Sequence, residues 1–243
     1  PENAVEVNLS GNAKLKVRLI DCVGYIVPSS MGYIEDGNPR MVKTPWYEEA
    51  IPFNMAAEIG TRKVITEHST IGVVVTTDGT IGDIPREEYK ECEEKVISEL
   101  KAINKPFIVL LNSTHPSEES TINMALRLSD EYSVKVLPVD CSKLNEIDIK
   151  NILENILFEF PIKQISISLP SWYKSLPLNS SVRNNILDAI ILKAKEIKKI
   201  SESHKLNDQL INCDEIDKVN TSLIDLGNGC VKIDADLKKE LYY

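Results

Sequence analysis

The stretch KLKVRLIDCVGY, residues 14–25, decides how the rest of the chain is interpreted. Apolar residues alternate with lysine and arginine along its first half, and the run then reaches an acid, Asp21. Alternation with a period of two predicts a β-strand with one buried face. We therefore expect a strand from Lys14 to Asp21 that enters a core and presents Asp21 at its C-terminal end.

The four residues from Asp21 to Gly24 form a D-x-x-G pattern. In a P-loop nucleotidase the acid of this pattern holds the water shell of Mg²⁺, and the glycine allows a backbone N–H to approach a γ-phosphate. The pattern is short, so a strand-ending aspartate followed by a turn glycine is the alternative interpretation. The segments that follow decide between the two.

Composition restricts the class of protein. The 243 residues are 42% hydrophobic and 27% charged, which is typical of a globular domain, and no apolar run reaches the ~18–20 residues of a membrane span. The net charge of −9 disfavours nucleic-acid binding. Five cysteines without C-x-x-C spacing and three dispersed histidines predict free thiols in a reducing compartment and no metal apart from nucleotide-borne Mg²⁺.

The N-terminal part predicts a hairpin and a long connection. Residues 4–9 alternate like a strand, residues 10–12 (Ser-Gly-Asn) favour a turn, and residues 14–21 return. Residues 26–53 contain four prolines and are too long for an ordinary loop. We expect a moving switch or an assembly surface there, with a small satellite core around its aromatic residues as the alternative.

A regular alternation of elements follows. Strands are expected at 71–75, 106–111 and 134–139, with helices at 54–68, 86–103, 118–132 and 147–160. Buried strands separated by helices predict a parallel sheet covered on both faces. Ligands bind at the carboxyl ends of such strands, where Asp21, Asp78, Asn112 and Ser142 are expected. The helix at 86–103 is expected to bury one face, made of Tyr89, Cys92, Val96, Leu100 and Ile103.

The pattern changes after Pro161. We expect a strand at 164–169, a long helix at 182–200 with a solvated basic end, a polar linker at 201–217, a hairpin at 222–233 and a helix from 236. The chain is thus divided into a nucleotidase domain, residues 1–161, and the start of a second, α+β domain, residues 162–243.

Three segments occur in the order found in GTPase-like folds: DCVG, then LLNST in place of the base-reading N-K-x-D motif, then VDCSKL, which resembles the S-A-K loop. The predicted fold class is α/β, a P-loop NTPase of the GTPase-like (TRAFAC) type with a mostly parallel sheet flanked by helices. Asn112 is kept, whereas Ser113 and His115 replace the lysine and the aspartate that grip guanine. Guanine specificity is therefore not expected.

Longer strings narrow the resemblance. RLIDCVGY, PRMVKTPWYEEAIPF, AAEIGTRKVITEHSTIGVVVTTDGTIGDI and LPSW resemble the stage IV sporulation protein A family, the coat-morphogenesis ATPases of endospore-forming Firmicutes. The resemblance implies a protein that binds and hydrolyses ATP and self-assembles as the basement layer of the spore coat, in the mother-cell cytoplasm on the outer forespore surface. It also implies two partners, a small amphipathic membrane-anchoring peptide and, in clostridia, a LysM-type coat protein.

The family's P-loop, G-x-x-x-x-G-K-[ST], does not occur between Pro1 and Tyr243. We therefore expect a fragment that lacks the P-loop and most of the family's C-terminal region, and that binds ATP weakly or not at all.

The resemblance also assigns roles. Asp21 would hold Mg²⁺ through water, Gly24 would present its N–H to the γ-phosphate, and Asn112 and Ser142 would lie near the base, with Asp78 a further candidate. Ordinary helix caps and an Asp-Gly turn remain the alternatives for these last three. A nucleotide-independent scaffold and a GTPase switch remain the alternative functions.

Overall fold

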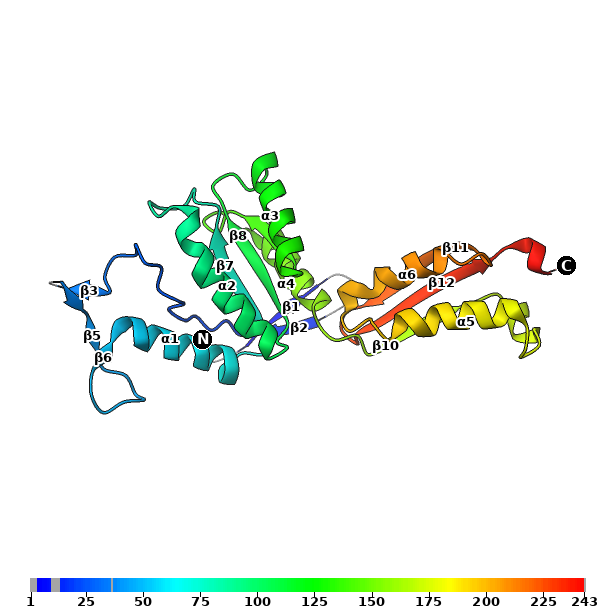
Figure 1. Cartoon of the computed structure of the whole chain (residues 1–243), viewed down its shortest axis with the longest axis horizontal. Helices are drawn as coiled ribbons and strands as arrows, with labels where there is room; N and C mark the ends of the chain where they lie inside the picture. Colours follow the sequence, from blue (N-terminus) through cyan, green and yellow to red (C-terminus); the bar gives the residue numbers. More distant parts are fainter. Residues whose placement is uncertain (1–3, 10–13, 36, 243) are drawn as a thin grey trace. The chain divides into compact units, whose positions relative to one another are not determined.

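The computed structural model describes residues 4–9, 14–35 and 37–242. They divide into two compact units, one of residues 18–156 and one that combines the described residues of 4–17 with residues 157–242. The first contains a parallel sheet flanked by helices and the second a mixed sheet with helices (Figure 1), so the predicted α/β class is confirmed.

The sheet of the first unit has three parallel strands in the order β7-β8-β9. They are β7 (Gly72–Thr77), β8 (Phe107–Asn112) and β9 (Val136–Val139), and the helices α2 (Arg86–Ala102), α3 (Glu119–Tyr132) and α4 (Glu146–Phe158) follow them in turn. Each of these elements was predicted within a few residues of its observed bounds.

The strands of this sheet are not equally buried. On the central strand β8, every residue from Phe107 to Leu111 is buried. On β7, Val74 is buried, whereas Val73 and Val75 are 42% and 58% exposed. The prediction of coverage on both faces therefore holds for β8 and is wrong for β7, which is an edge strand among the described residues.

The segment between the D-x-x-G motif and β7 is irregular until α1 (Phe53–Lys63), which continues into a π-helical turn, η2 (Val64–His68). The expected helix at 54–68 is thus confirmed. The preceding segment contains two minimal hairpins, β3 (Ile34–Glu35) with β4 (Asn38–Pro39) and β5 (Met41–Val42) with β6 (Ile51–Pro52).

The strand that was expected to reach Asp21 is shorter. β1 (Val5–Asn8) pairs antiparallel with β2 (Lys14–Val17), which confirms the hairpin, while its expected turn at 10–12 lies outside the described residues. β1 begins at Val5, the residue opposite Val17, so the chain after Val17 has no described strand residue to pair with. Leu19 is accordingly 75% exposed.

The second unit contains a three-stranded mixed sheet in the order β10-β12-β11. β10 (Gln164–Ser168) runs parallel to β12 (Cys230–Leu237), and β11 (Ile216–Asp225) runs antiparallel to it, so the predicted hairpin is confirmed and longer than expected. The buried residues of β12 alternate along one face: Val231, Ile233, Ala235 and Leu237.

Three expectations for the second unit are wrong. The long helix, α5 (Ser181–Ala194), ends early because the chain turns back and Ile200 donates its N–H to the carbonyl of Phe160, at 3.1 Å. The expected linker contains a short 3₁₀ turn, η4 (Ile200–Ser203), and helix α6 (His204–Ile211). The expected helix from 236 is instead the end of β12 followed by a 3₁₀ turn, η5 (Lys239–Tyr242).

A further 3₁₀ turn, η3 (Ser171–Ser175), follows β10.

Candidate functional site

Three loops follow the carboxyl ends of β7, β8 and β9, and Asn112 connects them. The N–H of Asp78 donates to the carbonyl of Asn112 at 3.3 Å, and the Asn112 side-chain Oδ1 accepts the N–H of Cys141 at 2.9 Å. The structure thus brings together the loops that carry Asp78, Asn112 and Ser142. In this position the Asn112 side chain serves the backbone of the neighbouring loop.

Asp78 is engaged within its own loop. Its Oδ1 accepts hydrogen bonds from the N–H and the hydroxyl of Thr80, at 2.9 and 2.6 Å. The Thr80 oxygen also accepts the N–H of Thr114 at 3.0 Å, which links this loop to the one after β8. Burial favours a higher pKa for Asp78, but hydrogen bonds from Ser113 and Thr80 outweigh it and lower the pKa. Asp78 is therefore a charged, structural turn residue here.

Asp140, which was not among the predicted site residues, organises the loop after β9. Its Oδ1 accepts the N–H and the hydroxyl of Ser142 at 3.0 and 2.5 Å, and its Oδ2 lies 2.8 Å from the Lys143 Nζ. The hydrogen bonds from Lys143 and Ser142 lower the pKa of Asp140 to about 2. An aspartate two residues before a serine was the available signal, because that spacing favours a local turn.

A cavity of about 460 Å³ is lined by β9, by the loops after β8 and β9, and by the first half of α4. Asp78, Asn112 and Ser142 are not among the residues that line it. Its walls combine apolar residues of β9 and α4 with polar residues of the loops, among them Leu137, Ile152, Thr114, Asp140 and Lys143.

Among the described residues, the D-x-x-G residues (21–24) make no hydrogen bond or ion pair with these loops. Asp21 is exposed, in a segment without secondary structure, and its carboxylate has no hydrogen-bond or ion-pair partner among the described residues. Gly24 has φ +80°, and an added Cβ would meet no atom within 4 Å. Its backbone conformation, and not crowding, therefore favours glycine at this position.

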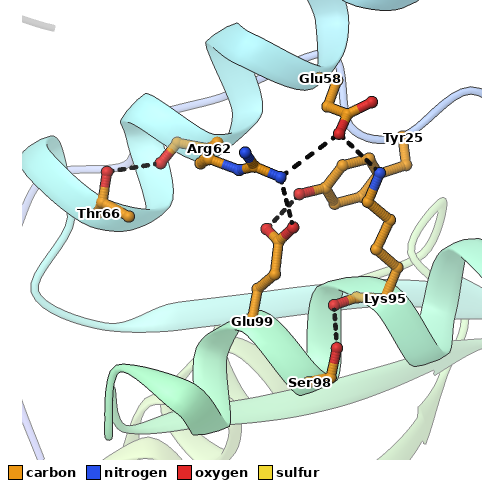
Figure 2. Close-up of polar contacts among 7 residues, drawn as sticks. All are labelled: Tyr25, Glu58, Arg62, Thr66, Lys95, Ser98 and Glu99. Atoms are coloured by element: carbon orange, nitrogen blue, oxygen red, sulfur yellow. Dashed lines mark hydrogen bonds and ion pairs between the residues drawn. The ribbon is translucent and has the colours of Figure 1, made fainter.

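The residue after Gly24 enters a network of charged side chains from α1 and α2 (Figure 2). The Tyr25 hydroxyl donates to Glu99, and the Lys95 ammonium lies 4.6 Å from the centroid of the Tyr25 ring. Arg62 donates to Glu99 at 3.2 Å and to Glu58 at 3.4 Å, and Lys95 donates to Glu58 at 2.8 Å. Burial, together with the hydrogen bond to Glu99, raises the pKa of Tyr25, so the phenol stays protonated and donates.

Two further contacts continue along the same helix. The Cys92 thiol donates to the carbonyl of Ile26 at 3.3 Å, and the N–H of Ser29 donates to the Glu88 Oε2 at 3.1 Å. The segment from Tyr25 to Ser29 is therefore held against α2 at both of its ends, through Tyr25 and Ile26 at one and Ser29 at the other. Sequence reasoning missed this contact because its two sides are between 59 and 74 residues apart.

The described residues contain no group of three or more His, Cys, Asp or Glu side chains that could hold a metal ion. Mg²⁺ bound with a nucleotide does not require such a group of side chains, since the ion keeps several waters and is held by one or two carboxylates together with the phosphates. An unengaged, exposed carboxylate such as that of Asp21 fits this kind of binding.

Cys22, beside Asp21, is an exposed free thiol, and the other four cysteines are free and partly buried. No described helix is both long and apolar enough to cross a bilayer.

A parallel β/α sheet with loops joined at its carboxyl edge, preceded by a D-x-x-G segment, defines an α/β protein of the nucleoside-triphosphatase type. Residues 1–161 match the family model described as "Stage IV sporulation protein A, ATPase domain", and residues 162–243 match "Stage IV sporulation protein A, middle domain". The chain belongs to the stage IV sporulation protein A family, as the sequence resemblance predicted.

The chain is similar to curated members of this family. It is 44% identical over 242 residues to stage IV sporulation protein A of Bacillus anthracis, 43% identical over 242 residues to that of Bacillus subtilis (strain 168), and 40% identical over 243 residues to that of Clostridioides difficile (strain 630). Each match covers 100% of this chain and 49–50% of the relative, so the chain spans about half their length. No solved structure is significantly similar to the chain.

Proposed function

We propose that the protein to which this chain belongs binds and hydrolyses ATP with Mg²⁺, and that hydrolysis drives its self-assembly into the basement layer of the spore coat. The observation that carries the proposal is the match of residues 1–161 to the ATPase domain of a sporulation family. ATP, when bound with Mg²⁺, supplies the phosphoryl group that is transferred to water.

The residues of the chain support separate parts of this proposal. Asp21 would hold Mg²⁺ through water, which its exposed and unengaged carboxylate permits. Gly24 would direct a backbone N–H to the γ-phosphate, and its positive φ supports a glycine-specific backbone there. Asn112 and Ser142 would form the base-side loops. A preference for adenine is supported by His115, which stands where guanine-binding relatives of the fold have an aspartate.

The proposed location is the mother-cell cytoplasm, on the outer forespore surface. The proposed partners are further copies of the protein, a small amphipathic membrane-anchoring peptide and, in clostridia, a LysM-type coat protein. Membership of the family supports these proposals.

A nucleotide-independent scaffold is the second candidate function. It is favoured by the engagement of Asp78 with Thr80 and of the Ser142 hydroxyl with Asp140, since neither group is directed into the cavity beside them. In this alternative the nucleotidase fold would serve only to bind coat partners.

The test is turnover of ATP and of GTP with Mg²⁺ by the full-length gene product that carries this chain, compared with Asp21→Ala. We expect ATP hydrolysis that falls by at least about 100-fold in Asp21→Ala, because a lost metal contact costs several kcal/mol of transition-state stabilisation. Asp83→Ala, which removes another exposed aspartate, is the matched control and should retain activity. Turnover of neither nucleotide would favour the scaffold, and a preference for GTP would overturn the proposed base.

A further inference from the structure

Four residues of α2 that contact the segment after Gly24 lie on one stripe of the helix. They are Glu88, Cys92, Lys95 and Glu99, spaced by four, three and four residues, which places them on a single helical face. The α2 face buried in the sheet core is a different one and contains Ile97 and Leu100. The stripe is therefore available to bind the segment, and all four of its residues do so.

The contacts run in opposite order along the two segments. Tyr25 contacts Glu99 and Lys95, Ile26 contacts Cys92, and Ser29 contacts Glu88. Since Ile26 and Ser29 contribute backbone groups, α2 fixes the path of the main chain as well as the Tyr25 side chain. The chain direction and position immediately after Gly24 are thus determined by α2.

The end of the stripe nearest to Gly24 is reinforced by α1. Glu99 accepts from both Tyr25 and Arg62, and Glu58 accepts from both Arg62 and Lys95 (Figure 2). Acids and bases alternate around this ring, so each charge is stabilised by its neighbours. Arg62 of α1 holds Glu99 from the side opposite its own helix backbone, and the Glu99 side chain is only 23% exposed, which makes it a fixed acceptor for the phenol.

We infer that Tyr25 and Glu99 are positioning residues of the proposed ATPase reaction, which hold the Gly24 N–H and the Asp21 carboxylate in place by fixing the residues directly after the D-x-x-G motif to α2. This inference rests on the proposed function. The two residues act through the main chain and do not touch the nucleotide. Their loss should therefore lower the rate of the chemical step more than the affinity for ATP.

The experiment combines Tyr25→Phe and Glu99→Ala in the full-length gene product. Tyr25→Phe removes only the donor hydroxyl, and Glu99→Ala removes the acceptor with a residue that favours helix. Tyr25→Phe should lower kcat about tenfold, the effect of one lost charge-assisted hydrogen bond, with little change in KM. Glu99→Ala also removes the bond from Arg62 and should lower kcat at least as much. The double variant should lose no more than Glu99→Ala alone, because that substitution already removes the bond to Tyr25. Glu99→Gln, which retains an acceptor, should give an intermediate kcat.

The control on the same helix is Glu94→Ala, which breaks only the exposed ion pair of Glu94 with Lys90, 3.7 Å apart. It should leave kcat unchanged. A KM effect without a kcat effect, or additive losses in the double variant, would overturn the inference.

Amide hydrogen exchange tests the contact independently of activity. In Tyr25→Phe and Glu99→Ala, the amides of residues 25–27 and of Ser29 should exchange faster, and those of β8 should not change. Unchanged exchange at residues 25–29 would show that the stripe does not hold the segment. If the wild-type protein hydrolyses no nucleotide but the exchange result is as expected, the proposed function fails while the contact stands.

Discussion

At the scale of single residues, the least expected feature is a carboxylate within the core of the first unit. Glu93 is 3% exposed, and its Oε1 lies 2.7 Å from both the Arg86 guanidinium and the Tyr132 hydroxyl. Its Oε2 is buried without a hydrogen-bond partner among the described residues. A charged pair at this depth is sensitive to the loss of one member, because the remaining charge is then unpaired.

We expect Glu93→Gln to lower the free energy of unfolding by about 3 kcal/mol, because Arg86 is left without its counter-charge in a site that is largely shielded from water. Urea denaturation followed by circular dichroism measures this change. Glu94→Gln, one residue further along α2 with an exposed partner, should change stability by less than about 1 kcal/mol. Equal effects of the two substitutions would contradict the importance of the buried pair.

Glu93 also shows what sequence can and cannot predict at this scale. The apolar face expected for α2 included Tyr89, Cys92 and Ile103, yet Ile103 is 42% exposed and Cys92 contacts Ile26, two residues after the D-x-x-G motif. Compared with the orientation that the apolar pattern predicts, α2 is rotated about its axis, so that Glu93 faces the core and accepts a hydrogen bond from Tyr132 of α3. Because that tyrosine lies 39 residues away in the sequence, periodicity alone could not reveal it.

At the scale of elements, the β/α alternation from β7 to α4 was predictable because its signals are strong. Each strand is a short apolar run, and each helix carries apolar residues at helical spacing. Asn112, at the end of β8, was placed at the correct edge of the sheet for the same reason. The predictions failed where partners decide the outcome: β2 ends at Val17 for lack of a pairing strand, and α6 was taken for a linker.

The finding that residues 204–211 form helix α6, and not a linker, can be tested by substitution. Leu206 and Leu210 are completely buried in the second unit, although the segment around them is polar. Leu206→Ala should lower the free energy of unfolding of this unit by about 3 kcal/mol through lost burial and the cavity that remains. Ile211→Ala removes a residue of the same helix that is 48% exposed and should cost less than about 1 kcal/mol. Thermal unfolding distinguishes the two, and a small effect of Leu206→Ala would restore the linker interpretation.

At the scale of the whole molecule, the shifted acids and tyrosines determine how stability depends on pH. Several carboxyl groups have pKa values below their usual 3.8 or 4.5, and three tyrosines have pKa values above 10.0. The lowered acids are Glu58, Asp78, Asp140, Glu146, Glu202, Asp225 and Asp234, and the raised tyrosines are Tyr25, Tyr132 and Tyr173.

The direction in which each shifted pKa changes stability with pH follows from the linkage between proton binding and folding. A lowered carboxyl pKa contributes stability above the unfolded value near 4, which is lost as pH falls toward the folded value, about 2 for Asp140. A raised tyrosine pKa contributes stability below 10.0, which is lost as pH rises above that value. We expect a plateau of stability between about pH 5 and 9, measured by urea denaturation across pH. Tyr132→Phe should reduce the alkaline decline, and an unchanged decline would contradict the assignment to Tyr132.

The exposed thiol inside the D-x-x-G motif has a practical consequence. Burial raises the pKa of Cys92, Cys141 and Cys213, so at neutral pH these thiols ionise less and react more slowly with alkylating reagents. Cys22 is the exposed one among the five cysteines. A maleimide fluorophore added in limiting amount should therefore attach first to Cys22, and would report on the environment of Asp21 and Gly24 without an engineered cysteine.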